Sequence, residues 1–191
     1  MNNEQLTRSF IALEFSDEVK SEFARIEKLF RESGADVKWV DPLMAHLTLK
    51  FLGSVTNDQI SSISERLRTI ASHFTPFGIK LESAGSFPKW DFPRVVWIGI
   101  GEGGETIKKV AKEVEDAMAA EGFEGEKRAF SPHITIGRVR SPKNKDKLKS
   151  IALKMEVKPV SCDISRIVLF KSELLRTGAV YSELASFPFK K

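Results

Sequence analysis

Two short segments of the chain alternate polar and apolar residues, and their sequences are nearly identical. Residues 46–49 read His-Leu-Thr-Leu, and residues 133–136 read His-Ile-Thr-Ile. A period of two is typical of a half-buried strand, in which residues i and i+2 lie on the same face. Each segment therefore predicts a strand that presents one His and one Thr on one face and packs its two aliphatic side chains on the other.

Three other segments repeat apolar residues every three or four positions, which predicts amphipathic helices. The first follows Ser16, a suitable N-cap, and ends at Gly34. The second begins at Thr56 and Gln59, which have capping-box spacing, and the third ends at Gly122. Their apolar positions are Val19, Phe23, Ile26 and Phe30; Ile60, Ile63, Leu67, Ile70 and Phe74; and Ile107, Val110, Val114 and Met118.

The remaining apolar segments predict strands, and a lysine-rich stretch over residues 142–153 predicts a fourth helix. Gly53 is expected to end the first His-x-Thr strand, and turns are expected at Asp163 and at Thr177-Gly178. Besides the two His-x-Thr strands, the expected strands are residues 8–15, 37–40, 78–86, 94–100, 156–162, 166–171 and 180–187.

The order of these elements is mixed, and several strand pairs have the spacing of hairpins, which favours an α+β fold over a doubly wound parallel sheet. A strand pair, a helix and a His-x-Thr strand occur twice, with the two phrases starting 87 residues apart. A chain of 191 residues fits one domain or two closely packed lobes. We expect two similar lobes that face each other and bring the two phrases together.

Composition and charge add few constraints. Apolar residues make up 41% of the chain and charged residues 29%, as in an ordinary globular protein, and the net charge of +4 mildly favours a polyanionic partner. The single Cys162 excludes an internal disulfide and a cysteine cluster for zinc. The N-terminus lacks a signal-peptide pattern and no apolar run is long enough to span a bilayer, so we expect a cytoplasmic protein without membrane contact.

The two histidines are the candidate catalytic residues. Histidine can act as acid or base near neutral pH, and a pair can divide the two roles. In-line attack on a phosphodiester needs that division, because the nucleophile loses a proton while the leaving oxygen gains one. Thr48 and Thr135 can donate hydroxyl hydrogen bonds to the phosphate oxygens. A single His-x-Thr is usually an ordinary strand segment; the repeat favours the functional interpretation.

Further candidates come from the neighbourhood of the phrases. By parity Lys50 shares the face of His46 and Thr48. Arg138 does not share the face of His133 and Thr135 by parity, and would reach a phosphate only if the strand twists or bulges there. Several aromatic residues offer a surface on which a base can stack, and the sequence does not choose among them: Phe10, Trp90, Phe92 and Tyr181. Lysines 143, 145, 147 and 149 suit a solvated helix face or a modest contact with RNA backbone.

Other kinds of site fit the sequence poorly. Neither motif histidine has a carboxylate or cysteine at ligand spacing, so no metal site is expected. The stretch Gly101–Gly104 lacks the lysine and Ser/Thr of a phosphate-binding loop. His73 near a helix C-terminus is expected to complement the helix dipole. Lys89-Trp-Asp-Phe92 lacks the glycine of a Lys-x-Asp-Gly nucleotidyl-transfer phrase, and no cofactor is expected.

The sequence resembles the two-histidine (2H) phosphoesterases, and within them the RNA 2′,3′-cyclic phosphodiesterases, also called 2′-5′ RNA ligases. The similarity covers essentially the whole chain in the family's order. It rests on Ser9–Leu13, His46–Gly53, Phe87-Pro88, Arg94–Gly99, Ser131–Arg138, and the closing Tyr181 and Phe187-Pro188.

This resemblance implies one bilobal 2H domain over residues 1–191, in which antiparallel sheets line a central groove. It implies metal-independent hydrolysis of RNA 2′,3′-cyclic phosphate ends, such as those of tRNA fragments, to 2′-phosphomonoesters, and reversible 2′-5′ ligation. His46 is then the proton donor and His133 the proton acceptor, although the near-identical motifs leave these roles exchangeable. Lys50, Arg138, Phe10 and Tyr181 are candidate substrate-binding residues.

Alternatives remain open from the sequence. The same site can act on small cyclic nucleotides, on ADP-ribose cyclic phosphate or on 2′-5′ oligoadenylate, and a non-catalytic module that binds RNA ends is a third possibility. Nothing in the sequence demands more than a monomer.

Overall fold

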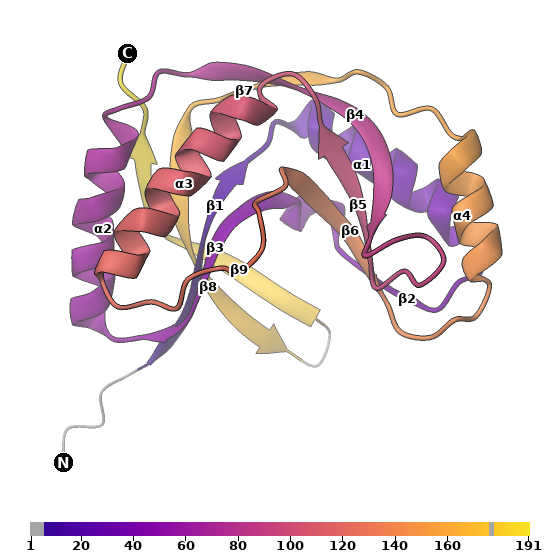
Figure 1. Ribbon diagram of the computed structural model, residues 1–191, viewed down its shortest axis with the longest axis horizontal. Helices are drawn as coiled ribbons and strands as arrows, with labels where there is room; N and C mark the ends of the chain where they lie inside the picture. Colours follow the sequence, from indigo (N-terminus) through magenta and orange to yellow (C-terminus); the bar gives the residue numbers. More distant parts are fainter. Residues whose placement is uncertain (1–5, 176–177) are drawn as a thin grey trace.

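The computed structural model describes residues 6–175 and 178–191 and has an α+β fold of two lobes (Figure 1). The elements in chain order are β1 (Thr7–Glu14), α1 (Asp17–Arg31), β2 (Val37–Trp39), the 3₁₀ turn η1 (Pro42–Met44), β3 (His46–Val55), α2 (Asn57–Ala71), β4 (Phe77–Phe87), β5 (Val95–Ile100), α3 (Gly104–Ala120), β6 (His133–Val139), α4 (Lys145–Lys154), β7 (Ser161–Ile164), β8 (Arg166–Leu175) and β9 (Gly178–Pro188). The predicted fold class is confirmed.

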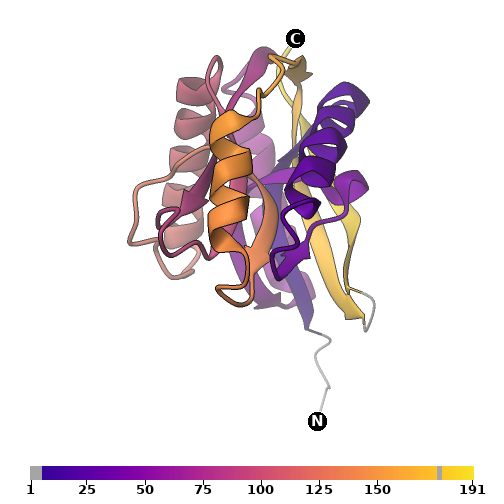
Figure 2. The same ribbon diagram turned by 90° about the vertical axis from the view of Figure 1, so that its right-hand side faces the viewer.

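Each His-x-Thr strand belongs to its own antiparallel sheet. The first lobe holds a four-stranded sheet in the order β3-β1-β8-β9, with α2 and α3 on one side. The second lobe holds a five-stranded sheet in the order β2-β6-β5-β4-β7, with α1 and α4 on one side. Helices α1 and α4 lie side by side at the end of the second lobe (Figure 2). The helices leave the opposite face of each sheet, here called its open face, uncovered.

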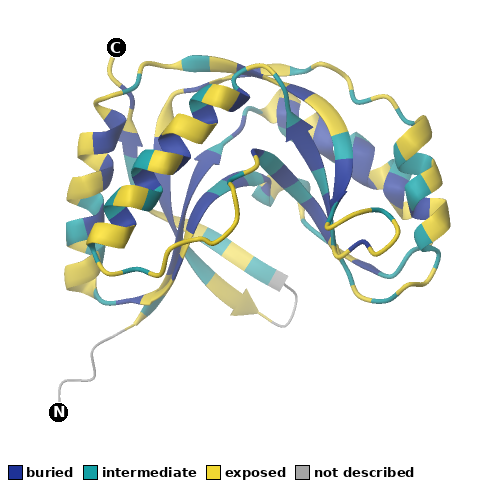
Figure 3. Cartoon of the chain, in the orientation of Figure 1, coloured by how far each residue is buried: buried dark blue, intermediate teal, exposed yellow. Residues whose placement is uncertain are grey.

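The core lies between each sheet and its helices, and it explains why these segments are helical. The apolar stripes of the helices face inward while their polar sides stay exposed (Figure 3). Phe23 and Ile26 of α1 and Ile63 and Leu67 of α2 are fully buried. The predicted capping box of α2 is present, with Thr56 and Gln59 each binding the other's backbone. The predicted helical periodicity is therefore confirmed in α1, α2 and α3.

Two expectations about strand ends are wrong. Gly53 does not end β3: it takes a left-handed φ of 73°, and the strand continues to Val55 past a register shift between Ser9 and Phe10 of β1. Gly53 therefore accommodates an irregularity in the strand, where the sequence suggested a turn.

The segment predicted as a strand over residues 156–162 is also different. Only Ser161–Ile164 forms a strand, and Asp163, the expected turn, pairs with Gly78 of β4. Pro159 has no N–H for a ladder, which accounts for the late start. The Thr177 half of the second expected turn lies outside the described residues, and Gly178 begins β9.

None of the helices among the described residues is long and apolar enough to cross a membrane.

Candidate active site

The first motif presents His46 and Thr48 on the open face of the four-stranded sheet. In the β1–β3 ladder, His46 pairs with Glu14 and Thr48 pairs with Ala12. Paired residues share a face, and Ala12 belongs to a small open-face cluster with Phe10. Leu47 packs in the core on the other side. The predicted division of this strand into a His/Thr face and an aliphatic face is confirmed.

A bulge at Leu49 takes Lys50 away from that face. The register passes from Thr48 opposite Ala12 to Lys50 opposite Ile11, which leaves Leu49 unpaired and moves Lys50 to the core side. Lys50 is only 7% exposed, and its Nζ donates to the Glu115 carboxylate at 2.8 Å and to the Glu124 carbonyl at 2.6 Å. The parity argument for Lys50 as a substrate-binding residue is therefore wrong.

The same bulge brings Phe51 onto the open face. Phe51 pairs with Phe10, their ring centroids are 6.1 Å apart, and its side chain is 64% exposed. Strict alternation places Phe51 on the core side, so sequence reasoning missed it. An exposed aromatic ring beside the first motif offers a surface on which a nucleobase can stack.

A second bulge changes the position of Arg138. His133 pairs with Gly99 and Thr135 with Trp97, but the next pair is Gly137 with Val96, which leaves Ile136 unpaired. Arg138 then pairs with Val95, on the same side of β5 as Trp97 and Gly99. Arg138 therefore shares the face of His133 and Thr135. The parity prediction is wrong, and the bulge that it named as an exception is present.

Aromatic rings hold both histidines in place. The ring of His46 packs 4.8 Å from Phe10 and 5.1 Å from Tyr181, the latter edge to face. Phe87 packs edge to face on His133 at 4.9 Å. Phe10 is 2% exposed, so it supports His46 from beneath and offers no surface for a base, contrary to expectation. Tyr181 lies beside His46, as a substrate-binding residue would.

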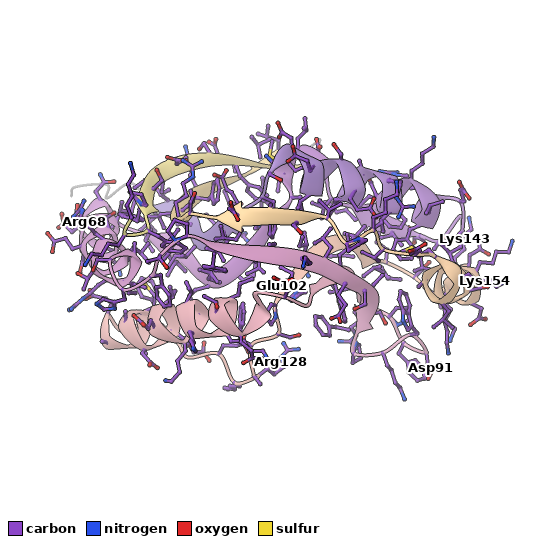
Figure 4. The ribbon with its side chains drawn as sticks, turned by 90° about the horizontal axis from the view of Figure 1, so that it is seen from above. Arg68, Asp91, Glu102, Arg128, Lys143 and Lys154 are labelled. Atoms are coloured by element: carbon purple, nitrogen blue, oxygen red, sulfur yellow. The ribbon has the colours of Figure 1, made fainter. Side chains whose placement is uncertain are left out.

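The other two aromatic candidates lie away from the histidines, in the β4–β5 loop. Trp90 packs toward the core, 6.4 Å from Phe30 of α1. Phe92 is 67% exposed, with the Nζ atoms of Lys89 and Lys145 over its ring. Figure 4 shows Asp91 of this loop at the same end of the molecule as α4. Neither ring contributes to the site around the two motifs.

The backbone orients both imidazoles in the same way. Nδ1 of His46 is 2.8 Å from the Met44 carbonyl, and Nδ1 of His133 is 2.6 Å from the Ser131 carbonyl. A carbonyl only accepts, so each Nδ1 carries a proton and each Nε2 is left for chemistry. Nε2 of His46 lies 3.0 Å from Thr48 Oγ1, whereas Nε2 of His133 makes no hydrogen bond to another described residue.

The electrostatic surroundings of the two rings differ. Burial lowers the pKa of both His46 and His133 below the ordinary value of histidine. The Glu14 carboxylate acts against this at His46, raising its pKa, while the Arg138 charge lowers the pKa of His133 further. Glu14 is the cross-strand partner of His46 and also pairs with Arg166. The sequence gave no signal for Glu14, because it comes from another strand.

The two motif strands meet in the middle of the molecule. β3 and β6 contact each other although they belong to different sheets, and they run side by side in Figure 1. Burial raises the pKa of Tyr181 in the first lobe, and the charge of Arg138 in the second lobe lowers it, so these two groups are near neighbours. Beyond His133, a pocket of about 250 Å³ continues along the open face, lined among others by Trp97 and Gly99.

Metal-binding side chains do not gather near this site. Over residues 6–175 and 178–191, no three His, Cys, Asp or Glu side chains lie close enough together to hold an ion. The remaining histidine, His73, pairs with Glu113 at 2.8 Å on the surface of the first lobe.

Comparison with known proteins points in one direction. A family profile described as the 2′-5′ RNA ligase superfamily matches residues 15–174. A protein of Methanothermobacter thermautotrophicus named RNA 2′,3′-cyclic phosphodiesterase is 33% identical over 94% of this chain and 97% of its own. One of Aeropyrum pernix with the same name is 36% identical over 84% and 91%.

Solved structures have the same fold. The Thermus thermophilus protein TT0787 superposes with a TM-score of 0.78 and 26% identity, over 95% of this chain and 97% of its own. Escherichia coli LigT, complexed with 3′-AMP, superposes with a TM-score of 0.75 at 22% identity, over 98% of this chain and all of its own.

Proposed function

The chain belongs to the 2′-5′ RNA ligase superfamily, and we propose on this premise that it hydrolyses the 2′,3′-cyclic phosphate at RNA ends to a 2′-phosphomonoester. The catalytic groups are His46 and His133, with Thr48 and Thr135 as donors to the phosphate oxygens. RNA 2′,3′-cyclic phosphodiesterase is the enzyme class of relatives that match nearly the full chain, which supports this assignment.

One observation carries the proposal: two histidines on adjoining strands have opposite charges as neighbours. The Glu14 carboxylate favours the protonated form of His46, and the Arg138 guanidinium favours the neutral form of His133. A protonated His46 is a general acid and a neutral His133 is a general base. This asymmetry supports the donor and acceptor roles that the near-identical motifs could not separate.

The reaction follows from these roles. His133 Nε2 takes a proton from water as the water oxygen attacks phosphorus. The bond from phosphorus to the 3′ oxygen breaks, and His46 Nε2 gives its proton to that oxygen. The 2′-phosphate ester remains, and the two histidines exchange roles in the reverse direction. When a 5′-hydroxyl attacks in the place of water, an RNA acceptor is joined instead, which accounts for ligation.

Protonation of His46 also prepares its threonine. Neutral His46 accepts the Thr48 hydroxyl hydrogen at Nε2, over the observed 3.0 Å. Once Nε2 is protonated it donates to Thr48 Oγ1, and the hydroxyl hydrogen becomes free for a phosphate oxygen. The acid form of the site and its phosphate-binding form are therefore the same form.

Product analysis tests the proposal directly. We expect an oligonucleotide with a 2′,3′-cyclic end to yield a 2′-phosphate in EDTA, with a mass gain of one water, and a joined 2′-5′ product when a 5′-hydroxyl acceptor is added. Recovery of the cyclic end unchanged after long incubation would support a binding module instead. A tRNA-fragment substrate, a monomeric state and a cytoplasmic location stay predictions.

The pH dependence should reflect the lowered histidine pKa values. Because both values fall below the ordinary one of about 6.5 in the free enzyme, the bell-shaped profile of kcat/KM should peak below pH 6.5. Bound phosphodiester, an anion, raises the pKa of His46, so the alkaline limb of the kcat profile should lie at higher pH. Glu14→Gln should move the alkaline limb of kcat/KM toward acid pH. A kcat/KM maximum above pH 7 in the unmodified enzyme would contradict this account.

Phe51→Ala should weaken substrate binding if its exposed ring stacks on a base. Loss of one base–aromatic stack costs about 1–3 kcal/mol, or about 5- to 150-fold in KM, with a smaller effect on kcat. Steady-state kinetics on a nucleoside 2′,3′-cyclic phosphate measures this. Phe92→Ala is a matched control, because Phe92 is similarly exposed but lies in the distant β4–β5 loop. Equal changes in KM for both variants would exclude a specific role for Phe51.

A further inference from the structure

Two cations of the second lobe lie directly opposite each other on its open face. In the β2–β6 ladder Lys38 pairs with Arg138, and paired residues share a face. The neighbouring Val37 and Trp39 pack toward the core, which confirms that Lys38 points the other way. Lys38 therefore belongs to the same face as His133 and Thr135, and its side chain is exposed.

This pairing is unfavourable in the protein alone. Like charges at directly opposite positions destabilise a sheet. Neither Lys38 nor Arg138 has a carboxylate within 4 Å among the described residues. Asp36 lies two residues before Lys38 in the same extended segment, but Arg140 is placed opposite it by a backbone hydrogen bond. The Lys38–Arg138 pair thus keeps its positive charge.

The pair starts at the catalytic groups and leads away from them. The charge of Arg138 acts on His133 and on Tyr181 across the groove, so its guanidinium lies near both. Lys38 is on the edge strand, one strand further out. An anionic chain that leaves the histidines along this face meets Arg138 first and Lys38 beside it.

We propose that Lys38 and Arg138 form a phosphate subsite for the RNA backbone, which holds the phosphodiester on the 5′ side of the cyclic terminal nucleotide. The inference rests on the proposed function for its ligand, an RNA strand. It makes the substrate an oligonucleotide rather than a mononucleotide, because only the former carries the upstream phosphate. Lysine also protects edge strands from aggregation, and that role would leave RNA affinity unchanged.

Equilibrium binding of a product-like RNA tests the subsite independently of turnover. Fluorescence anisotropy gives the affinity of an oligoribonucleotide ending in a 2′-phosphate, and competition gives that of a nucleoside 2′-monophosphate. For Lys38→Gln we expect the ratio of these affinities to fall about 5-fold at 0.1 M salt, and the slope of log affinity against log salt to decrease by about 0.7, the value for one contact with a single strand. The melting temperature should be unchanged or higher, because a like-charge pair is removed.

Lys28→Gln is the matched control, since Lys28 is exposed on the outer surface of α1, away from the open face. It should change neither the affinity ratio nor the salt slope. An unchanged ratio and slope in Lys38→Gln, or an equal loss of affinity for both ligands, would overturn the subsite even if hydrolysis proceeds normally. Conversely, the expected binding changes in a protein that fails to hydrolyse cyclic ends would support the subsite and reject the proposed reaction.

Discussion

Replacing either His46 or His133 with alanine is expected to lower kcat on a cyclic-ended oligonucleotide by about 10²- to 10⁴-fold, the usual contribution of one general acid or base. Each imidazole has its Nδ1 bound to a backbone carbonyl, so only Nε2 exchanges protons with the substrate. The fold should persist, because both rings lie on open faces outside the main core. Circular dichroism and thermal melting check the fold, and rapid-quench assays in EDTA measure the rate.

His73→Ala is the control, because this histidine pairs with Glu113 on the surface. It should retain full activity. The two motif variants can then be distinguished by the leaving group. An aryl phosphodiester that releases p-nitrophenolate needs no general acid, so His46→Ala should lose much less activity on it than His133→Ala does. Full activity of either motif variant on RNA would reject the mechanism, and the opposite pattern on the aryl ester would reverse the roles.

Local patterns were enough to predict most of the fold. Periodicity and capping located α1, α2 and α3, and alternation located the His-x-Thr strands, because each of these features depends on residues close in sequence. The strand over residues 156–162 was misplaced since its pairing with β4 depends on a distant partner. Local sequence carries little information about which strand supplies the ladder.

The two errors at the site have one physical cause. A bulge follows each His-x-Thr, at Leu49 and at Ile136, and each shifts all later side chains to the opposite face. In the first lobe the bulge removes Lys50 and brings in Phe51. In the second it brings in Arg138. Neither Leu49 nor Ile136 differs from an ordinary strand residue, so parity alone could not reveal the bulges.

The bulges also make the two halves of the site different in chemistry. Counted from each histidine, Phe51 and Arg138 occupy the same position, five residues on. One lobe therefore offers an aromatic ring at this position and the other a guanidinium. Together with Glu14 beside His46, this gives a site with an apolar surface and an acid on one side, and a cation and a base on the other. A nucleotide has the same division, with a flat base and a charged phosphate.

The threonines should have the second-largest effect on turnover. Thr48→Val and Thr135→Val each keep the shape of the side chain and remove one hydroxyl donor. Because charge builds on the phosphate oxygens as the 3′ oxygen leaves, loss of one positioned donor should lower kcat by about 10²- to 10³-fold, with a smaller change in KM. Serine in the place of either threonine keeps the donor and should restore most of the activity.

The two threonine variants should differ in their pH behaviour, since only Thr48 bonds to its histidine. In Thr48→Val the protonated Nε2 of His46 loses its acceptor, so the pKa of His46 should fall and the alkaline limb of the kcat/KM profile should move toward acid pH. Thr135→Val should keep the limbs of the wild-type profile at a lower rate. Steady-state kinetics between pH 5 and 8 separates the two effects. Unchanged kcat in both valine variants would show that the hydroxyls do not bind the phosphate in the transition state.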